Sequence, residues 1–251
     1  MDQLTAEKRL TLAYLFCIVA GTTTSVTTGI AWGHWYRTLD QCVGDRNCSC
    51  IIYGQHTATV FLGGPQAPCI WTTFGPLFYI FFCIGLTCFH GYRVLFTTKS
   101  PRMRTTRSVM AKMELGEAVQ IQTITQEVTS SLPRAFWVCV SVLSVFFTVY
   151  SLVHFGIYVD GYYETCNQYR KTLERLLSLH GSALPVIYHR LTCQGVFDFM
   201  DYMQLDTGVA YRNGIINTGI ALILGVASSG ISWILFLFAS VLNIKLAKAG
   251  D

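Results

Sequence analysis

The residues of this 251-residue chain with the greatest capacity for chemistry are its ten cysteines and six histidines. Cys48 and Cys50 form the closest cysteine pair, but the CxxC spacing that membrane thiol oxidoreductases generally present does not occur. The histidines are scattered, and no HExxH, GxSxG or Walker sequence accompanies them. We therefore expect structural disulfides, no enzyme activity, no metal site and no cofactor. A thiol-redox enzyme that uses Cys48 and Cys50 is the third-ranked alternative.

Four apolar stretches must position these side chains. The chain is 52% hydrophobic and 13% charged, whereas a soluble domain averages about 25% charged residues. The stretches 10–32, 74–96, 132–157 and 215–237 are each long enough to cross about 30 Å of hydrocarbon as a helix. None shows the alternation of a barrel strand. The sequence thus predicts an all-α membrane protein built on a bundle of four transmembrane helices.

Basic residues orient the four spans. Lys8 and Arg9 precede the first span, seven basic residues lie from position 93 to position 134, and Lys245 and Lys248 follow the fourth span. The positive-inside rule assigns these segments to the cytoplasm. We therefore expect cytoplasmic segments 1–9, 97–131 and 238–251, outside loops 33–73 and 158–214, and both termini in the cytoplasm. The net charge of +4 gives no indication of a nucleic-acid partner.

The distribution of cysteines agrees with this orientation. Six lie in the two outside loops: Cys42, Cys48, Cys50, Cys69, Cys166 and Cys193. The other four lie within spans, and the cytoplasmic segments contain none. Disulfides require an oxidising compartment, which indicates a multi-pass protein of the plasma membrane or the secretory pathway. Many pairings of six cysteines exist, and the residues alone do not select one.

The first span also has features of a cleaved signal peptide. Lys8 and Arg9 are followed by an apolar run, and Gly29-Ile30-Ala31 supplies small residues at a cleavage position. Cleavage after Ala31 would leave three spans and would place the new N-terminus outside. We therefore favour a retained first transmembrane helix.

Two spans carry a face of small residues at intervals of four, the spacing that places side chains on one side of a helix. In the first span this face is Ala13, Cys17, Gly21, Ser25, Gly29 and Gly33; in the fourth it includes Ala221, Gly225 and Ser229. Small residues let membrane helices approach closely. The faces therefore predict contact among the chain's own helices or docking of another membrane protein. Lining of a polar pore by the hydroxyl groups of residues 21–29 is the weakest of the three interpretations.

The two outside loops are expected to form a small disulfide-braced domain. The first loop contains a short strand that ends at Gly63-Gly64-Pro65, which predicts a hairpin held by Cys50–Cys69. Asn47 begins a glycosylation sequon. In the second loop, residues 169–181 predict a short amphipathic helix. The following sequence "VFDFMDYMQLD" either contacts a partner or packs onto the first loop.

The segment between the second and third spans is strongly basic. Its candidates for contact with anionic lipid headgroups are Lys99, Arg102, Arg104 and Arg107. Membrane lipids are therefore expected partners of this segment.

Four cysteine contexts resemble those of one known family. They are "CSCIIYG" at 48–54, "APCIWTTFG" at 67–75, "YYETCNQY" at 162–169 and "LTCQG" at 191–195. Together they resemble the transmembrane protein 179 family, which has four spans and no established enzymatic activity. The resemblance implies that Cys50, Cys69, Cys166 and Cys193 are the family's outside cysteines. It also implies one bridge within each loop plus Cys42–Cys48, with pairing between the loops as the open alternative.

These observations favour a non-enzymatic tetraspan protein that serves as an accessory subunit of a larger membrane complex, such as an ion channel or receptor. Its partner would be another integral membrane protein, bound through the small-residue faces and the outside domain. The alternative is a pore-forming homo-oligomeric channel subunit, in which the hydroxyl-rich first span would line the path.

Overall fold

Four long helices dominate the computed structural model, which describes residues 3–39, 48–57, 61–97, 103–104, 126–127, 132–176, 191–203 and 216–249. They are α1 (Gln3–Leu39), α2 (Gln66–Thr97), α3 (Arg134–Leu176) and α6 (Thr218–Ala249). Each contains a segment long and apolar enough to cross a membrane: Leu4–Tyr36, Gln66–Phe96, Arg134–Arg175 and Thr218–Lys248. The predicted set of four membrane-spanning helices is confirmed at this level.

The helices extend well beyond the apolar stretches that predict them. α3 has 43 residues, which corresponds to about 65 Å of helix against about 30 Å of hydrocarbon. It therefore continues past residue 157 and includes "YYETCNQY", where the sequence analysis expected the second loop to begin. The helix expected at residues 169–181 is helical up to Leu176, but these residues prolong α3 and do not form a separate helix. The remainder of that segment lies outside the described residues.

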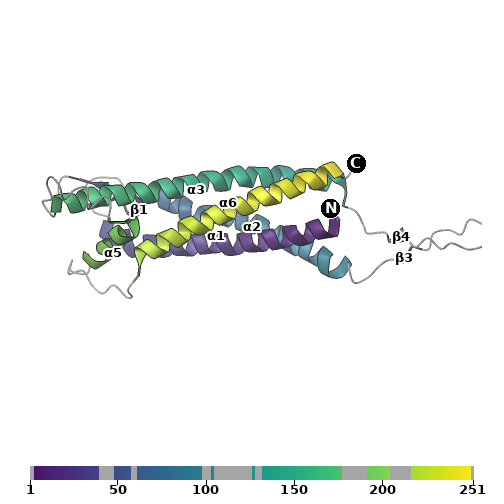
Figure 1. The fold of residues 1–251 in the computed structure, drawn as a ribbon, viewed down its shortest axis with the longest axis horizontal. Helices are drawn as coiled ribbons and strands as arrows, with labels where there is room; N and C mark the ends of the chain where they lie inside the picture. Colours follow the sequence, from purple (N-terminus) through teal and green to yellow (C-terminus); the bar gives the residue numbers. More distant parts are fainter. Residues whose placement is uncertain are drawn as a thin grey trace, which may run out of the picture.

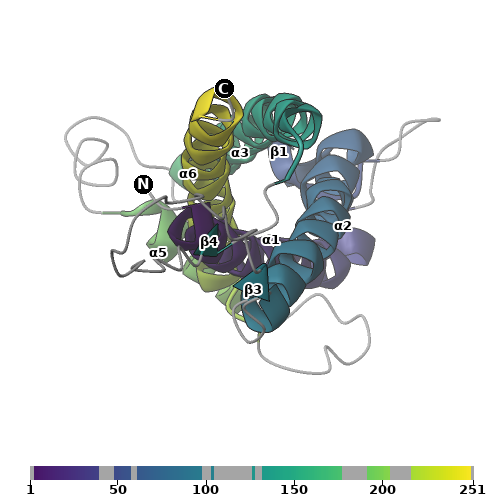
Figure 2. The same cartoon turned by 90° about the vertical axis from the view of Figure 1, so that its right-hand side faces the viewer.

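The four helices form an elongated bundle (Figure 1). α1 packs extensively on α2 and on α6, and α6 packs extensively on α3, whereas α2 and α3 contact each other less. The end-on view in Figure 2 shows the same arrangement. Both chain termini lie at one end of the bundle, which we call the termini end.

A small cap, formed by β1, β2 and α5, covers the opposite end of the bundle (Figure 1). Strand β1 (Cys50–His56) pairs antiparallel with β2 (Phe61–Gly64), which confirms the expected hairpin. The register shifts between Cys50 and Gln55, so the hairpin is irregular there. Helix α5 (Cys193–Met203) completes the cap. A second pair of two-residue strands, β3 (Met103–Arg104) and β4 (Gln126–Glu127), was not expected from the sequence.

Candidate functional site

The small-residue face of α1 packs against α2. A Cβ atom at Gly21 would lie 2.7 Å from Tyr79 Cε2 and 3.0 Å from Ile80 Cγ1, and one at Gly29 would lie 3.3 Å from Thr73 Cγ2. These distances leave almost no room for a side chain, so the glycines permit the close approach of the two helices. We call this contact the close seam. Ala13 and Cys17 are also buried, whereas Gly33 has open space around it.

The small-residue face of α6 packs against α3. A Cβ atom at Gly225 would lie 2.2 Å from the Tyr158 hydroxyl oxygen, and Ser229 is buried with its hydroxyl donating to Val226 O at 2.8 Å. Ala221 packs at the edge of the hydrophobic core beneath the cap. Both small-residue faces are therefore largely occupied by contacts within the chain.

The hydroxyl groups of α1 are mostly satisfied inside the protein. Thr22 and Thr23 donate to the carbonyl oxygens of Ile18 and Val19 on their own helix. Two other threonines face the bundle interior and were not singled out by the sequence analysis. Thr24 hydrogen-bonds Ser228 of α6 at 2.8 Å, and Thr28 donates to Tyr158 of α3 at 2.7 Å.

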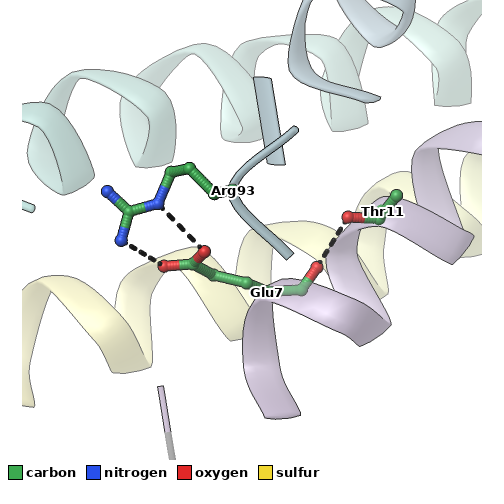
Figure 3. A network of polar contacts seen from close by, with 3 residues as sticks. All are labelled: Glu7, Thr11 and Arg93. Carbon is green, nitrogen blue, oxygen red and sulfur yellow. Dashed lines mark hydrogen bonds and ion pairs between the residues drawn. The ribbon is translucent and has the colours of Figure 1, made fainter. Parts of the chain in front are cut away.

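A buried ion pair closes the close seam near the termini end (Figure 3). Arg93 Nε and one of its terminal nitrogens each donate to a Glu7 carboxylate oxygen at 3.1 Å. The Glu7 side chain is 3% exposed and that of Arg93 is 17% exposed. Thr11 donates to the Glu7 carbonyl oxygen at 2.8 Å. Glu7 was not recognised from the sequence, because it precedes the apolar stretch that begins at residue 10. It nevertheless belongs to α1, since this helix begins at Gln3, four residues before Glu7.

The contact between α2 and α3 contains large side chains, and we call it the wide seam. Aromatic pairs fill it: Trp71–Tyr150, Phe82–Phe147, Phe89–Phe136 and His90–Trp137, with ring centroids 4.7 to 5.7 Å apart. Pro76 lies inside α2, and proline has no N–H to donate to the carbonyl four residues earlier. That carbonyl, Thr72 O, lies 3.3 Å from His154 Nε2 of α3. The histidine thus supplies the donor that Pro76 lacks.

Disulfides tie the cap to the long helices. Cys50 of β1 is bonded to Cys69 of α2, and Cys166 of α3 is bonded to Cys193 of α5. Cys48 is disulfide-bonded as well. In the described part of the chain, Cys17, Cys83, Cys88 and Cys139 are free thiols.

Several candidate residues lie outside the described part of the chain. They are Cys42, Asn47, Lys99, Arg102 and Arg107. Arg104 belongs to β3, and its side chain is not described. The glycosylation and lipid-headgroup interpretations therefore stay predictions.

The hairpin docks onto α3 at a position that requires glycine. A Cβ atom at Gly161 would lie 1.9 Å from Ile52 Cγ2. Tyr53 has a φ of 61°, a conformation that is uncommon for residues other than glycine. Its hydroxyl donates to Asp160 at 2.8 Å. Burial, together with the bond to Asp160 and its charge, raises the pKa of Tyr53 to about 12.

A histidine also joins the hairpin to α3. His56 Nδ1 lies 2.7 Å from the Thr172 hydroxyl oxygen. Burial lowers the pKa of His56, and the positive charges of Arg175 and Lys171 lower it further. The lowered pKa disfavours the protonated imidazole at this contact.

Helix α5 holds the beginning of α6. Asp201 accepts hydrogen bonds from the Thr218 backbone N–H at 2.7 Å and from its hydroxyl at 2.6 Å. Trp35 Nε1 donates to the same hydroxyl at 2.8 Å. A carboxylate at a helix N-terminus also interacts favourably with the helix dipole. Burial raises the pKa of Asp201, and the hydrogen bonds from Thr218 oppose this shift.

Three apolar residues at the start of the sequence "VFDFMDYMQLD" turn inward. Val196, Phe197 and Met200 of α5 are 0% exposed and belong to the core beneath the cap, together with Ile51 and Ile52 of the hairpin. The sequence analysis left two interpretations of this segment, contact with a partner or packing onto the first loop. Val196, Phe197 and Met200 agree with packing onto the first loop. Asp198 remains on the exposed side of the helix.

The described residues contain no group of three or more histidine, cysteine, aspartate or glutamate side chains placed to hold a metal ion. Comparison of the chain with protein-family models, curated proteins and solved structures finds no match. The molecule is thus defined by its architecture: four helices able to span a membrane, a two-stranded sheet and two disulfides among the described residues.

Proposed function

We propose that the chain is a non-enzymatic multi-pass membrane protein that acts as an accessory subunit of a larger membrane complex, such as an ion channel or receptor. The observation that carries this proposal is a pair of outward-facing glycines in the middle of long helices. Nothing lies within 4 Å of a Cβ atom built at Gly85 of α2 or at Gly156 of α3.

Glycine inside a helix is less favourable than alanine by about 1 kcal/mol. Gly21 and Gly225 have a packing reason within the chain, because a neighbouring side chain occupies the space that a Cβ atom would need. Gly85 and Gly156 have no such reason. Small residues on a membrane helix allow another helix to approach closely, so these positions fit docking of a partner helix.

The proposed orientation has the cap outside the cell and both termini in the cytoplasm. It rests on the basic residues near the span ends and on the disulfides, which need an oxidising compartment. The basic segment between α2 and α3 would then face anionic lipid headgroups. The resemblance to the transmembrane protein 179 family agrees with a four-span protein without enzymatic activity.

Purification in mild detergent with quantitative identification of bound proteins tests the proposal. Gly85→Leu and Gly156→Leu fill the outward positions, and at least one should lower recovery of the partner severalfold. Val149→Leu is the matched control, because Val149 is 57% exposed on α3 and already has a bulky side chain. Thermal stability of all variants should stay within about 1 kcal/mol of the parent. A lone monomer without a co-purifying membrane protein would contradict the proposal.

The pore-forming alternative has one specific observation in its favour. A shallow hollow of ≈ 410 Å³ on α1 is lined by Ile18, Val19, Thr22, Thr23, Val26 and Thr27. Its threonine hydroxyls donate to carbonyls of their own helix, so they offer little to a permeating ion. Reconstituted protein that conducts ions, with a conductance altered by Thr23→Val/Thr27→Val, would favour the pore.

A further inference from the structure

Three helices bring polar side chains together in the half of the bundle near the termini end. Tyr14 of α1, Ser144 of α3 and Asn243 of α6 are each no more than 1% exposed. Asn243 Nδ2 lies 2.8 Å from the Tyr14 hydroxyl oxygen and 2.8 Å from Ser144 Oγ. The two hydroxyl oxygens lie 3.3 Å apart. We call these three residues the polar hub.

The hydrogen bonds of the hub do not use all of its donors and acceptors. The two hydrogens of the Asn243 amide go to Tyr14 and Ser144. One hydroxyl hydrogen bridges the two hydroxyl oxygens, and the other hydroxyl hydrogen is left over. Asn243 Oδ1 is buried and has no partner among the described residues. The hub therefore has a spare donor and a spare acceptor.

His90 of α2 adds to this imbalance. Its ring stacks on that of Tyr14 with centroids 6.4 Å apart, and on that of Trp137 with centroids 5.7 Å apart. It is 0% exposed, and neither ring nitrogen has a hydrogen-bond partner in the described part of the chain. A neutral imidazole carries one N–H donor and one acceptor. A buried polar group that is left without a hydrogen-bond partner destabilises the fold.

We propose that the polar hub binds water, held by Asn243 Oδ1 and by the spare hydroxyl hydrogen of Tyr14 or Ser144, and that this water also reaches the ring nitrogens of His90, which are unpartnered within the described residues and lie beside Tyr14. Water donates and accepts, and buried waters typically satisfy groups of this kind. An ion fits less well, because the hub itself has no charged side chain. Glu7 and Arg93, which form the buried ion pair of this half of the bundle, bond each other.

Radiolytic hydroxyl-radical labelling of the full chain in lipid bilayers tests this proposal, because bound water is the local source of the radical. Tyr158 is the internal control: it is 0% exposed, and its hydroxyl accepts from Thr28. Oxidation of Tyr14 should exceed that of Tyr158 severalfold. Asn243→Leu removes the amide and should bring Tyr14 down to the level of Tyr158. Equal oxidation of Tyr14 and Tyr158 in the parent protein would overturn the proposal.

A second measurement does not depend on a core variant that folds. In protein with ¹⁵N-labelled histidine, magnetisation from water should reach the His90 ring nitrogens faster than those of His154. His154 is the matched control, because it is 1% exposed and has Thr72 O as its protein partner. Transfer to His90 no faster than to His154 would likewise overturn the proposal.

Discussion

The two sides of α2 meet their neighbours in opposite ways. Toward α1, in the close seam, Gly21 and Gly29 let the helix backbones approach until a single Cβ atom would clash or press on α2. Toward α3, in the wide seam, pairs such as Phe82–Phe147 fill the space between the helices. Both solutions satisfy the same requirement, because lipid gives helices no hydrophobic reason to associate and close packing must hold them.

The seams also satisfy polar groups differently. The close seam ends in a buried ion pair of Glu7 and Arg93, whereas the wide seam uses His154 to reach a carbonyl that Pro76 cannot bond. Neither the close approach of backbones in the close seam nor the aromatic packing in the wide seam completes its contact alone. Each seam depends on at least one polar side chain whose loss should be measurable.

The largest expected effect is that of Arg93→Leu at the end of the close seam. Removal of the guanidinium leaves the Glu7 carboxylate buried without this partner, which should lower the free energy of unfolding by about 3–5 kcal/mol. The double variant Glu7→Leu/Arg93→Leu should recover most of this loss, because no buried charge remains. Denaturation in detergent micelles measures both. Equal losses in the single and double variants would show that the pair does not hold the seam.

Gly21→Leu is the direct test of close approach. The added side chain must displace Tyr79 and Ile80, and overpacking of this kind costs about 1–3 kcal/mol. Gly33→Leu is the matched control on the same small-residue face, because the space around Gly33 is open. It should not destabilise the protein and should raise the free energy of unfolding by up to about 1 kcal/mol, because leucine is the better helix former. If the two substitutions have the same effect, the close seam is not limited by glycine.

His154→Phe tests the wide seam. It removes the donor to Thr72 O and should cost about 1–2 kcal/mol, the penalty of a buried carbonyl without a partner. In a Pro76→Ala background the cost should be much smaller, since the restored backbone N–H can donate to Thr72 O within the helix. A double-mutant cycle by denaturation measures the difference. Additive effects would mean that His154 does not compensate for the proline.

The smallest expected effect is the pH dependence of His56, which lies in the cap and belongs to neither seam. Because the pKa of His56 is lower in the folded protein than its usual value near 6.5, the unfolded chain binds a proton first as the pH falls. The stabilising contribution of His56 is present above about pH 6.5 and is lost below it. The protection factors of the hairpin amides, which compare their exchange with the intrinsic rate at each pH, should therefore fall as the pH is lowered below about 6.5. His56→Gln should remove this pH dependence. If the variant keeps the pH profile of the parent, the dependence arises from a group other than His56.

Much of the fold follows from local features of the sequence. Apolar stretches of sufficient length predict four helices, because any segment that crosses the bilayer must satisfy its backbone internally. The short strand before Gly63-Gly64-Pro65 predicts the hairpin, although Gly63 and Gly64 belong to β2 and do not form the turn between its strands. The bridge Cys50–Cys69 matches the expectation for the hairpin, and Cys166–Cys193 matches the bridge within the second loop that the family resemblance implied.

The candidate site was predicted less completely. The periodic small face of α1 was visible, but not the helix that it contacts. Glu7, Thr24, Thr28 and His154 were not recognised as contacts between helices. Glu7 stands outside the apolar stretch, and the threonines looked like part of one hydroxyl-rich face. Burial on an interior face, on which their roles depend, is not encoded by hydropathy within a single segment.

By itself, the sequence determined which four segments are long and apolar enough to span a membrane, which of them carry a face of small residues, and where cysteines are available for disulfides. Only the tertiary structure decided that the face of Gly21 meets Tyr79 of α2, that Gly225 meets Tyr158 of α3, and that Val196 and Phe197 turn inward. The physical reason is the separation along the chain of the residues that interact. Helix formation and membrane insertion depend on residues within one segment, whereas the choice of neighbour depends on shape complementarity between segments far apart in the chain.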